Sequence, residues 1–513
     1  MPAQIMAGGK GGEDLPAQLT WQVFVCCIIA AFGGLMFGYD IGISGGVTAM
    51  DDFLLKFFPT VYVKKHKAKE NNYCKYDNQM LQLFTSSLYL AAVVCSLAAS
   101  KCCTRFGRKR TIQLASLFFF IGVVLNVSAV NIVMLILGRL CLGAGVGFGN
   151  QAVPLFISEI APAKYRGGLN ILFQMMVTVG ILCANVVNYK TSKVHPNGWR
   201  ISLGGAAIPA LLLGLGSLII VETPSSLIER GRAEEGLETL RKIRGVKDVD
   251  KEFVEILYAT ERAKKVKQPF RNLMKRSSRP QLVCSSVLQM FQQFTGINVI
   301  MFYAPVLFQT MGLGSDASLL SAVVTGSINS ASTLIAIFSV DKFGRRILLI
   351  EAAIQMLIAQ LITGIVLALH LHSTNSISKH YAYVVVILIC LFVSGFAWSW
   401  GPLGWLIPSE IFPLETRTAG FFVAVSTNMI FTFLIAQAFL TMLCHMRSGI
   451  FFFFSGWIVI MGVFAIFLLP ETKGIPIDEM DERAWKKHWY WKRYFKDEFV
   501  DQEEPKPKLQ VTG

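Results

Sequence analysis

Long apolar blocks, separated by short charged stretches, recur along the whole of this chain and limit what it can fold into. Blocks such as 114–130, 201–221 and 383–398 approach the roughly 20 residues that an α-helix needs to cross a hydrocarbon core of about 30 Å. One such block would suit the core of a water-soluble domain, but a whole series exceeds any single soluble core. The sequence therefore predicts an all-α polytopic membrane protein with about twelve transmembrane helices.

The composition agrees with this reading, because 53% of the 513 residues are hydrophobic and only 16% are charged. Soluble domains are closer to a quarter charged. The expected spans lie near 22–46, 81–101, 111–130, 132–153, 168–188, 201–220, 281–310, 319–340, 347–370, 381–407, 419–441 and 449–470. The first twenty residues are polar, so we expect no cleavable signal peptide, and the span that begins near Trp21 serves as an uncleaved signal.

The net charge of +15 does not indicate nucleic-acid binding, because the basic residues gather between the spans. Lys and Arg collect in 101–110, in 341–346, in the central segment and in the C-terminal tail, which is the pattern of cytoplasmic loops. The partner is therefore a lipid bilayer, and both termini are expected in the cytoplasm. The Lys-rich loop 47–80 opposes this orientation, but charge in longer loops has less weight.

A charged central segment divides the spans six and six. The predicted organisation is a cytoplasmic N-terminal tail (1–21), an N-terminal half (22–221) with a long external loop (47–80), a cytoplasmic helical linker (222–280), a C-terminal half (281–470) and a cytoplasmic C-terminal tail (471–513).

Three motifs occur in the same order in both halves, which indicates an internal duplication. RFGRKR (105–110) matches KFGRR (342–346), the Ser-Glu…Arg pattern at 158–166 matches the one at 409–417, and ETP (222–224) matches PET (470–472). Two similar six-helix halves with a midplane site form the architecture of the major facilitator superfamily, and these motifs resemble its sugar-porter branch.

The charged motif residues have two possible roles. They can latch the halves together on the cytoplasmic side, with Glu159/Arg166 and Glu410/Arg417 as pairs, or they can form a solvated row that only sets topology. The candidate latch residues are Arg105, Arg108, Glu159, Arg166, Arg345, Glu410 and Arg417.

Two opposite charges lie inside spans, where charged groups are costly and therefore informative. Asp40 is in the first span and Arg139 in the fourth. Burial favours a protonated carboxyl group, whereas a nearby guanidinium favours the ionised one. The pair is therefore either a proton switch or a permanent structural ion pair.

The glycine run 143–149 lacks the context of a phosphate loop, and its GxxxG spacing favours close helix packing.

Amide side chains in the second half are candidates for binding a neutral polar substrate. Gln289, Gln292 and Gln293 share one helical face, and Gly296 and Asn298 follow. Amides offer donors and acceptors to hydroxyl groups, although in membranes they also join helices. We favour binding for the Gln292, Gln293 and Asn298 set. Further candidates are Gln174, Asn329, Asn428 and a tryptophan cluster at 398–405 that includes Trp405.

Of the eleven cysteines, Cys74 and Cys444 fall in segments expected outside the cell, where a disulfide can persist. The sequence does not show whether they lie close enough to pair.

The histidines near 370–380 do not form a convincing metal set, and we expect neither metal nor cofactor.

Three stretches make the resemblance specific: GGLMFGYD (33–40), QQFTGINVIMFYAP (292–305) and SWGPLGW (399–405). They are similar to the sugar transport protein family of plants, whose members are monosaccharide–proton symporters, and the similarity runs from about residue 20 to about residue 495. The resemblance implies a sugar site at Gln174, Gln292, Gln293, Asn298, Asn329, Asn428 and Trp405. It further implies a proton donor–acceptor pair at Asp40 and Arg139, a helical lid in 47–80, and a lid disulfide between Cys74 and Cys444.

The implied function is uptake of a hexose with a proton across the plasma membrane by alternating access, with a monomer as the functional unit. A facilitative uniporter would share the sugar site but would not need an acid in the first span. A sugar sensor that does not transport would typically carry a longer signalling tail. No nucleophile–base set or nucleotide motif indicates an enzyme.

Overall fold

The computed structural model is helical, with no β-strand among the residues that it describes. These are residues 19–67, 74, 76–162, 165–246, 248–265, 269–310, 314–370, 378–413, 415–475 and 480–495. Within these ranges, twelve helical segments are long and apolar enough to cross a membrane, which confirms the predicted fold class. The predicted tails lie outside the described residues over 1–18 and 496–513.

Six spans precede the linker and six follow it. The first six are formed by α1 (Trp21–Ala49), α4 (Gln79–Phe106), α5 (Arg108–Val127), α6 (Ile132–Ile160), α7 (Arg166–Thr191) and the pair α8 (Gly198–Gly204) and α9 (Ala207–Ile219). The second six are formed by α14 (Arg279–Phe294) with α15 (Ile297–Thr310), α16 (Ser315–Phe343), α17 (Arg345–His370), α18 (Lys379–Ala397) with α19 (Trp400–Ile411), α20 (Arg417–Met446) and α21 (Gly449–Phe467).

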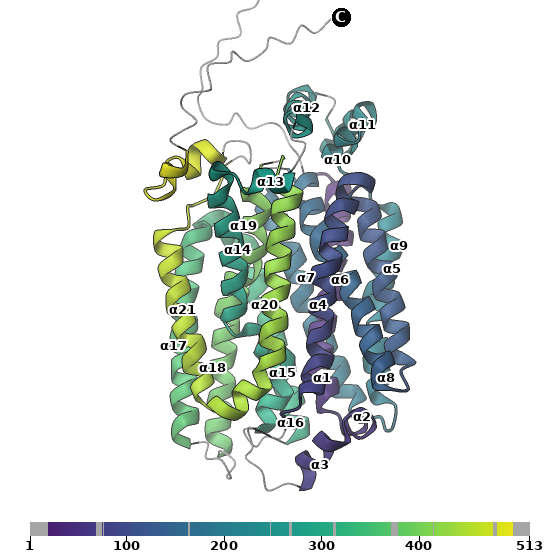
Figure 1. Cartoon of the computed structure of the whole chain (residues 1–513), viewed down its shortest axis with the longest axis vertical. Helices are drawn as coiled ribbons and strands as arrows, with labels where there is room; N and C mark the ends of the chain where they lie inside the picture. Colours follow the sequence, from purple (N-terminus) through teal and green to yellow (C-terminus); the bar gives the residue numbers. More distant parts are fainter. Residues whose placement is uncertain are drawn as a thin grey trace, which may run out of the picture.

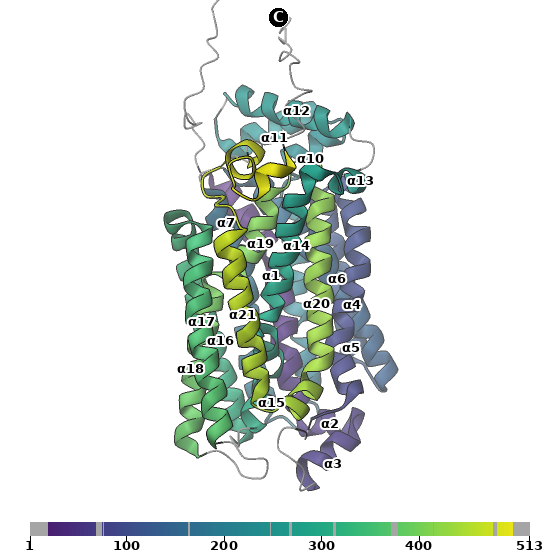
Figure 2. The ribbon, with the colours of Figure 1, turned by 60° about the vertical axis from the view of Figure 1, so that its left-hand side comes forward.

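Short helices cover both ends of the bundle (Figures 1 and 2). The linker contributes α10 (Pro224–Glu229), α11 (Ala233–Arg244), α12 (Asp250–Lys265) and α13 (Pro269–Leu273). We call this end the linker face. The opposite end carries α2 (Asp51–Phe57) and α3 (Pro59–Lys67), the lid helices, and we call it the lid face.

Three of the described spans are each broken into two helices, which hydropathy did not predict. Gly296 lies between α14 and α15 with a φ of 84°, a conformation that glycine adopts readily. The break between α18 and α19 falls at Trp398 and Ser399. In transporters, discontinuous helices of this kind are typical of substrate sites.

The glycine run in α6 packs against two neighbouring helices. A Cβ at Gly143 or Gly147 would lie 2.1 or 2.6 Å from the carbonyl oxygens of Leu88 and Ala92 in α4. A Cβ at Gly145 would lie 2.6 Å from Phe119 in α5. These distances leave no room for a side chain, so the glycines allow the close helix approach that the GxxxG spacing indicates.

A glutamate from the end of the first half caps helix α5. Glu222 accepts hydrogen bonds from the backbone N–H groups of Arg108 and Lys109, at 3.0 and 3.2 Å. Gly107 precedes this helix with a φ of 95°. The carboxylate satisfies N–H groups that a helix leaves unpaired and complements the helix dipole.

The second half repeats this arrangement. Glu471 accepts from the N–H groups of Arg345 and Arg346, both at 3.0 Å, and Gly344 precedes α17 with a φ of 93°. The motifs duplicated in the sequence therefore build the same local structure twice.

We expect Gly107→Ala to destabilise the protein more than Gly231→Ala does. Both glycines have a positive φ, so each substitution should cost about 1–3 kcal/mol in backbone strain. A Cβ at Gly107 would also lie 2.2 Å from the Glu222 carboxylate, whereas nothing lies within 4 Å at Gly231. Thermal unfolding of the two purified variants measures the difference. Equal losses would contradict a specific role for the Glu222 cap.

The lid helices pack on the first half through aromatic side chains. Phe53 is fully buried, and its ring centroid lies 5.2 Å from that of Phe84 and 5.9 Å from that of Trp199. Phe57 lies 5.3 Å from Trp199, edge to face. The stretch 51–58 thus buries apolar side chains against the spans, as expected for the helical lid in 47–80 that the family resemblance implies.

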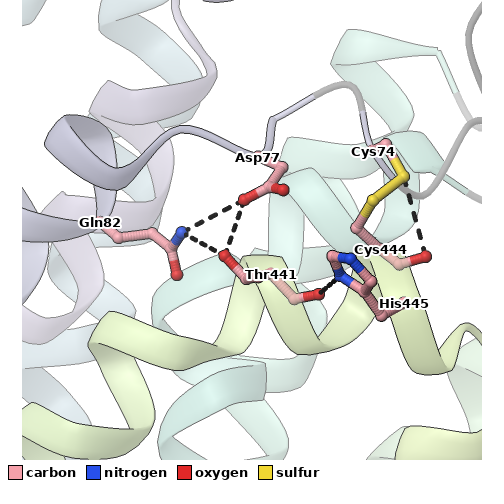
Figure 3. The surroundings of a disulfide bond; sticks show 6 residues. All are labelled: Cys74, Asp77, Gln82, Thr441, Cys444 and His445. Carbon is pink, nitrogen blue, oxygen red and sulfur yellow. Dashed lines mark hydrogen bonds between the residues drawn. A yellow bond between two sulfur atoms is a disulfide. The ribbon is translucent and has the colours of Figure 1, made fainter.

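A disulfide between Cys74 and Cys444 joins the segment after the lid helices to α20 of the second half, with the Cα atoms 4.6 Å apart (Figure 3). Hydrogen bonds beside it hold α20 to the first half: Thr441 donates to Asp77 at 2.8 Å, and Gln82 of α4 donates to Thr441 at 3.1 Å. The expected bridge is therefore confirmed, and it links residues 370 positions apart.

Candidate functional site

Asp40 in α1 and Arg139 in α6 form a buried ion pair. Arg139 Nη1 donates to Asp40 Oδ1 at 2.5 Å, and the side chains are 0% and 1% exposed. Arg139 also donates to Ser44 Oγ at 2.6 Å and to the Phe84 carbonyl at 3.0 Å, and its guanidinium lies 4.6 Å from the Phe84 ring centroid. Asp40 Oδ2 is buried and has no hydrogen-bond partner among the described residues. The arrangement leaves one carboxylate oxygen able to accept a proton.

The amides of the second half form a continuous hydrogen-bonded network. Asn428 of α20 donates to Gln289 Oε1 at 2.6 Å and to Gln292 Oε1 at 2.7 Å. Gln293 donates to Gln292 Oε1 at 3.4 Å, and Asn298 of α15 donates to Gln293 Oε1. We call these five residues the amide network. It joins α14, α15 and α20 at the break that Gly296 allows.

Backbone carbonyls at the start of α19 complete the network. Gln292 Nε2 donates to the carbonyls of Trp400 and Gly401 at 3.0 and 2.9 Å. A Cβ on Gly401 would lie 3.3 Å from Gln174 Nε2, so this first-half amide lies next to the network. The predicted residues Gln174, Gln292, Gln293, Asn298 and Asn428 are therefore brought together.

The last two predicted sugar-site residues, Trp405 and Asn329, lie on helices α19 and α16. Trp405 is buried in α19, with its ring centroid 5.6 Å from that of Phe173 and 6.5 Å from that of Phe421. Asn329 of α16 is buried and lies 3.8 Å from the Met301 sulfur, and its Oδ1 has no hydrogen-bond partner in the described chain. An unpaired buried amide oxygen is a candidate acceptor for a hydroxyl group.

Helices α1 and α15 connect the ion pair to the amide network. A Cβ on Gly45 would lie 2.2 Å from the Phe302 carbonyl, so the two helices are in backbone contact there. Phe302 lies one turn after Asn298, and its ring packs 5.5 Å from that of Tyr89. The first-half charge pair and the second-half amides are therefore linked by direct packing.

On the linker face, the first-half latch candidates form buried ion pairs. Arg108 pairs with Glu159 at 2.8 Å and with Glu229 of α10 at 2.7 Å. Thr223 donates to the second oxygen of Glu159 at 2.6 Å. The sequence grouped Glu159 with Arg166 and did not identify Glu229. Arg105 lies outside this cluster: it is exposed, and its guanidinium lies 5.4 Å from the Phe106 ring centroid.

The second-half latch candidates form a matching cluster. Arg345 pairs with Glu410 at 3.3 Å and with Asp341 at 3.2 Å. The positive charge of Arg166, from the first half, acts on Glu410, so this cluster extends across the two halves. Arg417 is buried beside it and donates to the Phe412 carbonyl at 3.5 Å.

Hydrogen bonds join the halves at both faces. Near the linker face, Asp341 accepts from the Gly168 N–H at 3.2 Å, and Asn170 donates to Ser409 at 2.8 Å. Towards the lid face, Ser86 donates to Gln437 at 2.6 Å. The amide network lies between these contacts.

Several residues of the site were not selected from the sequence. Ser44 lies four residues after Asp40, so helical spacing alone would have placed it beside the carboxylate. Gln289 was noted on the amide face but not assigned to the site. The carbonyls of Trp400 and Gly401 leave no signal in a sequence, because every residue has a backbone carbonyl.

The structure has two six-span halves with broken helices. One half holds a buried ion pair and the other a buried amide network. This combination defines a transporter of the major facilitator type. The family described as "Sugar (and other) transporter" matches residues 26–484. Sugar transport protein 8 of Arabidopsis thaliana is 65% identical over 496 residues, which cover 97% of this chain and 98% of that protein. Sugar transport protein MST4 of Oryza sativa subsp. japonica is 60% identical over 497 residues, 96% of each chain.

Among solved structures, the proton:xylose symporter XylE bound to 6-bromo-6-deoxy-D-glucose matches with a TM-score of 0.78 and 26% identity, over 90% of this chain and 99% of that one. The partially occluded, inward-open conformation of XylE from E. coli matches with a TM-score of 0.71 and 25% identity. The chain belongs to the sugar transporter family of the major facilitator superfamily. Its relatives are transporters and not enzymes.

Proposed function

We propose that this protein takes up a hexose together with a proton across the plasma membrane. The observation that carries the proposal is the buried Asp40, which has one oxygen bonded to Arg139 and the other unpaired. A purely structural ion pair would gain from satisfying both oxygens, whereas a proton site needs one oxygen free. The likeness to a proton:xylose symporter supports the same assignment.

In this proposal, the hexose binds between the halves at four members of the amide network (Gln292, Gln293, Asn298 and Asn428), at Gln174 and at Asn329, with Trp405 against the sugar ring. The network supports this because its amides offer both donors and acceptors, which hydroxyl groups need. It carries no net charge, so it holds a neutral sugar without trapping an ion. The described site residues are buried between hydrogen bonds at both faces, which suits a site reached by alternating access.

Protonation of Asp40 is the proposed trigger. It removes the charge that Arg139 neutralises, while Arg139 keeps its bonds to Ser44 and to the Phe84 carbonyl. Helix α1 is then free to shift against α6. Because α1 is in backbone contact with α15 at Gly45, the shift reaches the helix that carries Asn298.

The two halves, 22–221 and 281–470, are proposed to rock as two bodies around this site. We place the linker face and both termini in the cytoplasm and the lid face outside, because the basic stretches 101–110 and 341–346 lie at the linker face. The ion-pair clusters around Arg108 and Arg345 then act as the cytoplasmic latch. The monomer is the proposed functional unit.

Competition uptake in cells that lack their own hexose carriers tests the proposal. Labelled glucose is supplied with an excess of unlabelled galactose, mannose, fructose or xylose, with and without a protonophore. We expect hexoses to compete and the protonophore to abolish accumulation above the outside concentration. Uptake that no hexose inhibits would contradict the substrate class, and accumulation that survives the protonophore would contradict symport.

Breaking the lid disulfide should make uptake more sensitive to external pH. The bridge ties the lid segment, which packs on the first half, to α20 of the second half, so its loss should open the proton site to bulk solvent. We expect Cys74→Ala, Cys444→Ala and the double variant to lose uptake together at neutral pH and to keep it at acidic pH. Cys183→Ala, which removes an exposed free thiol, is the matched control. Unequal behaviour of the three variants would show that the two cysteines do not act as one bridge.

A further inference from the structure

A groove on the outer surface of the second half lies between α17 and α18, apart from the sugar site. It has a volume of about 390 Å³. Glu351 and Gln355 line one part of it, and the other lining residues are apolar, among them Ile358, Ile362, Leu388 and Leu391. Ile358, Ile362 and Leu391 are each more than 40% exposed, as expected for side chains that face lipid.

Glu351 is an unusual residue for this surface, because acidic groups in spans normally face the bundle interior. Asp40 and Glu410 follow that rule: they are 1% and 7% exposed and are ion-paired. Glu351 is exposed, and its Oε2 accepts a hydrogen bond from Trp398 Nε1 at 3.1 Å. A cationic partner would lower the cost of an outward-facing carboxylate at membrane depth.

The depth of Glu351 places it within reach of lipid headgroups. It lies six residues after Arg345, which starts α17 at the linker face, or about 9 Å along the helix axis. The 26 residues of α17 span about 39 Å, compared with a hydrocarbon core of about 30 Å. Glu351 is therefore close to the boundary of the hydrocarbon core.

The polarity of the groove is ordered along the membrane normal. Because α17 runs from the linker face towards the lid face, Glu351 is followed by Gln355, Ile358 and Ile362 on successive turns towards the midplane (Figures 1 and 2). Gln355 uses its amide to donate to the Leu391 carbonyl and to Ser394, at 2.8 and 3.0 Å. A polar end at the boundary and an apolar floor below it match a lipid of the linker-face leaflet.

We propose that this groove binds a phospholipid whose headgroup carries a primary amine. The ammonium donates to the Glu351 carboxylate beside the Trp398 bond, and one acyl chain lies along Ile358, Ile362 and Leu388. Charge complementarity selects the headgroup: a carboxylate repels anionic headgroups, and a trimethylammonium group has no N–H to donate.

The site adjoins the bend that leads into α19. Trp398 caps α18 at the break, and two residues later Trp400 Nε1 donates to the Leu349 carbonyl of α17 at 3.0 Å. The lipid would therefore contact the segment that fixes the start of α19.

Native mass spectrometry of the full-length protein tests the proposal. The protein is reconstituted with equal amounts of phosphatidylethanolamine and phosphatidylcholine that have identical acyl chains, and the retained lipids are counted. We expect the ethanolamine lipid to be retained over the choline lipid by about fivefold to tenfold, the size of a charge-assisted hydrogen bond. Glu351→Gln, which is nearly isosteric, should bring the ratio close to one.

Two further variants separate the groove from general effects. Asp316→Asn removes an exposed carboxylate at the lid-face start of α16 and should leave the preference unchanged. Ile358→Trp fills the groove floor and should reduce retention of both lipids. With wild-type protein alone, a series of mono-, di- and trimethylated ethanolamine lipids should show retention falling as N–H groups are lost. Equal retention across that series, preference kept in Glu351→Gln, or retention of an added sterol in place of the amine lipid would overturn the proposal.

Discussion

Asp40→Asn is expected to abolish uphill accumulation of sugar while the protein still folds and reaches the membrane. The amide oxygen can still accept the hydrogen bond from Arg139, so the packing of α1 against α6 is kept. The amide group cannot bind and release a proton, so transport loses its link to the proton gradient. A potential of 100 mV supplies about 2.3 kcal/mol per charge. This energy corresponds to an accumulation of about fiftyfold, which the variant should lose.

The measurement is the steady-state ratio of internal to external labelled sugar at acidic external pH. Exchange of labelled for unlabelled sugar at equal concentrations is the control, because it requires no net proton movement and should persist in the variant. Ser44→Ala is the matched variant: it removes an Arg139 acceptor but leaves the carboxylate, so accumulation should survive. If Asp40→Asn accumulates sugar as well as wild type does, Asp40 is a structural partner of Arg139 and not the proton site.

The spans were predictable because a run of about 20 apolar residues is a direct physical requirement for crossing a membrane. Asp40 and Arg139 were predictable for a related reason: charges inside such runs are rare, and opposite charges in one bundle tend to pair. The structure brings them together at 2.5 Å. The amides at 292 and 293 were selected by helical spacing and Asn298 by its place shortly after them, and the three do form one network with Asn428.

Other features depend on three-dimensional contacts that a sequence does not display. The sequence shows Glu222 and Glu471 only as parts of a duplicated motif at the ends of the halves, yet each caps a helix more than 100 residues away in the chain. Glu229 reads as a solvated linker residue but pairs with the buried Arg108. The Cys74–Cys444 pairing was implied by the family resemblance and not by spacing, because a separation of 370 residues carries no distance information.

Asn298→Ala and Trp405→Ala should weaken sugar binding far more than they weaken the fold. Asn298 has one side-chain hydrogen bond that the structure assigns, to Gln293, and Trp405 contacts its neighbours through ring packing. Removing a partner of a buried hydroxyl group costs about 1–3 kcal/mol. We therefore expect KM for uptake to rise by about tenfold or more in either variant.

Gln289→Ala provides the contrast that separates binding from helix packing. Both ends of its amide are used by the protein: Oε1 accepts from Asn428 at 2.6 Å, and Nε2 donates to the Gly404 carbonyl at 2.7 Å. This variant should lower the thermal stability of the purified protein more than Asn298→Ala does, because it leaves two buried partners unsatisfied. Uptake kinetics and thermal unfolding are measured on the same three variants. Gln292→Ala is a fourth variant, and it should have both a higher KM and a lower thermal stability. If KM is unchanged in Asn298→Ala, Trp405→Ala and Gln292→Ala, the amides and the indole only hold the helices together, and the sugar binds elsewhere.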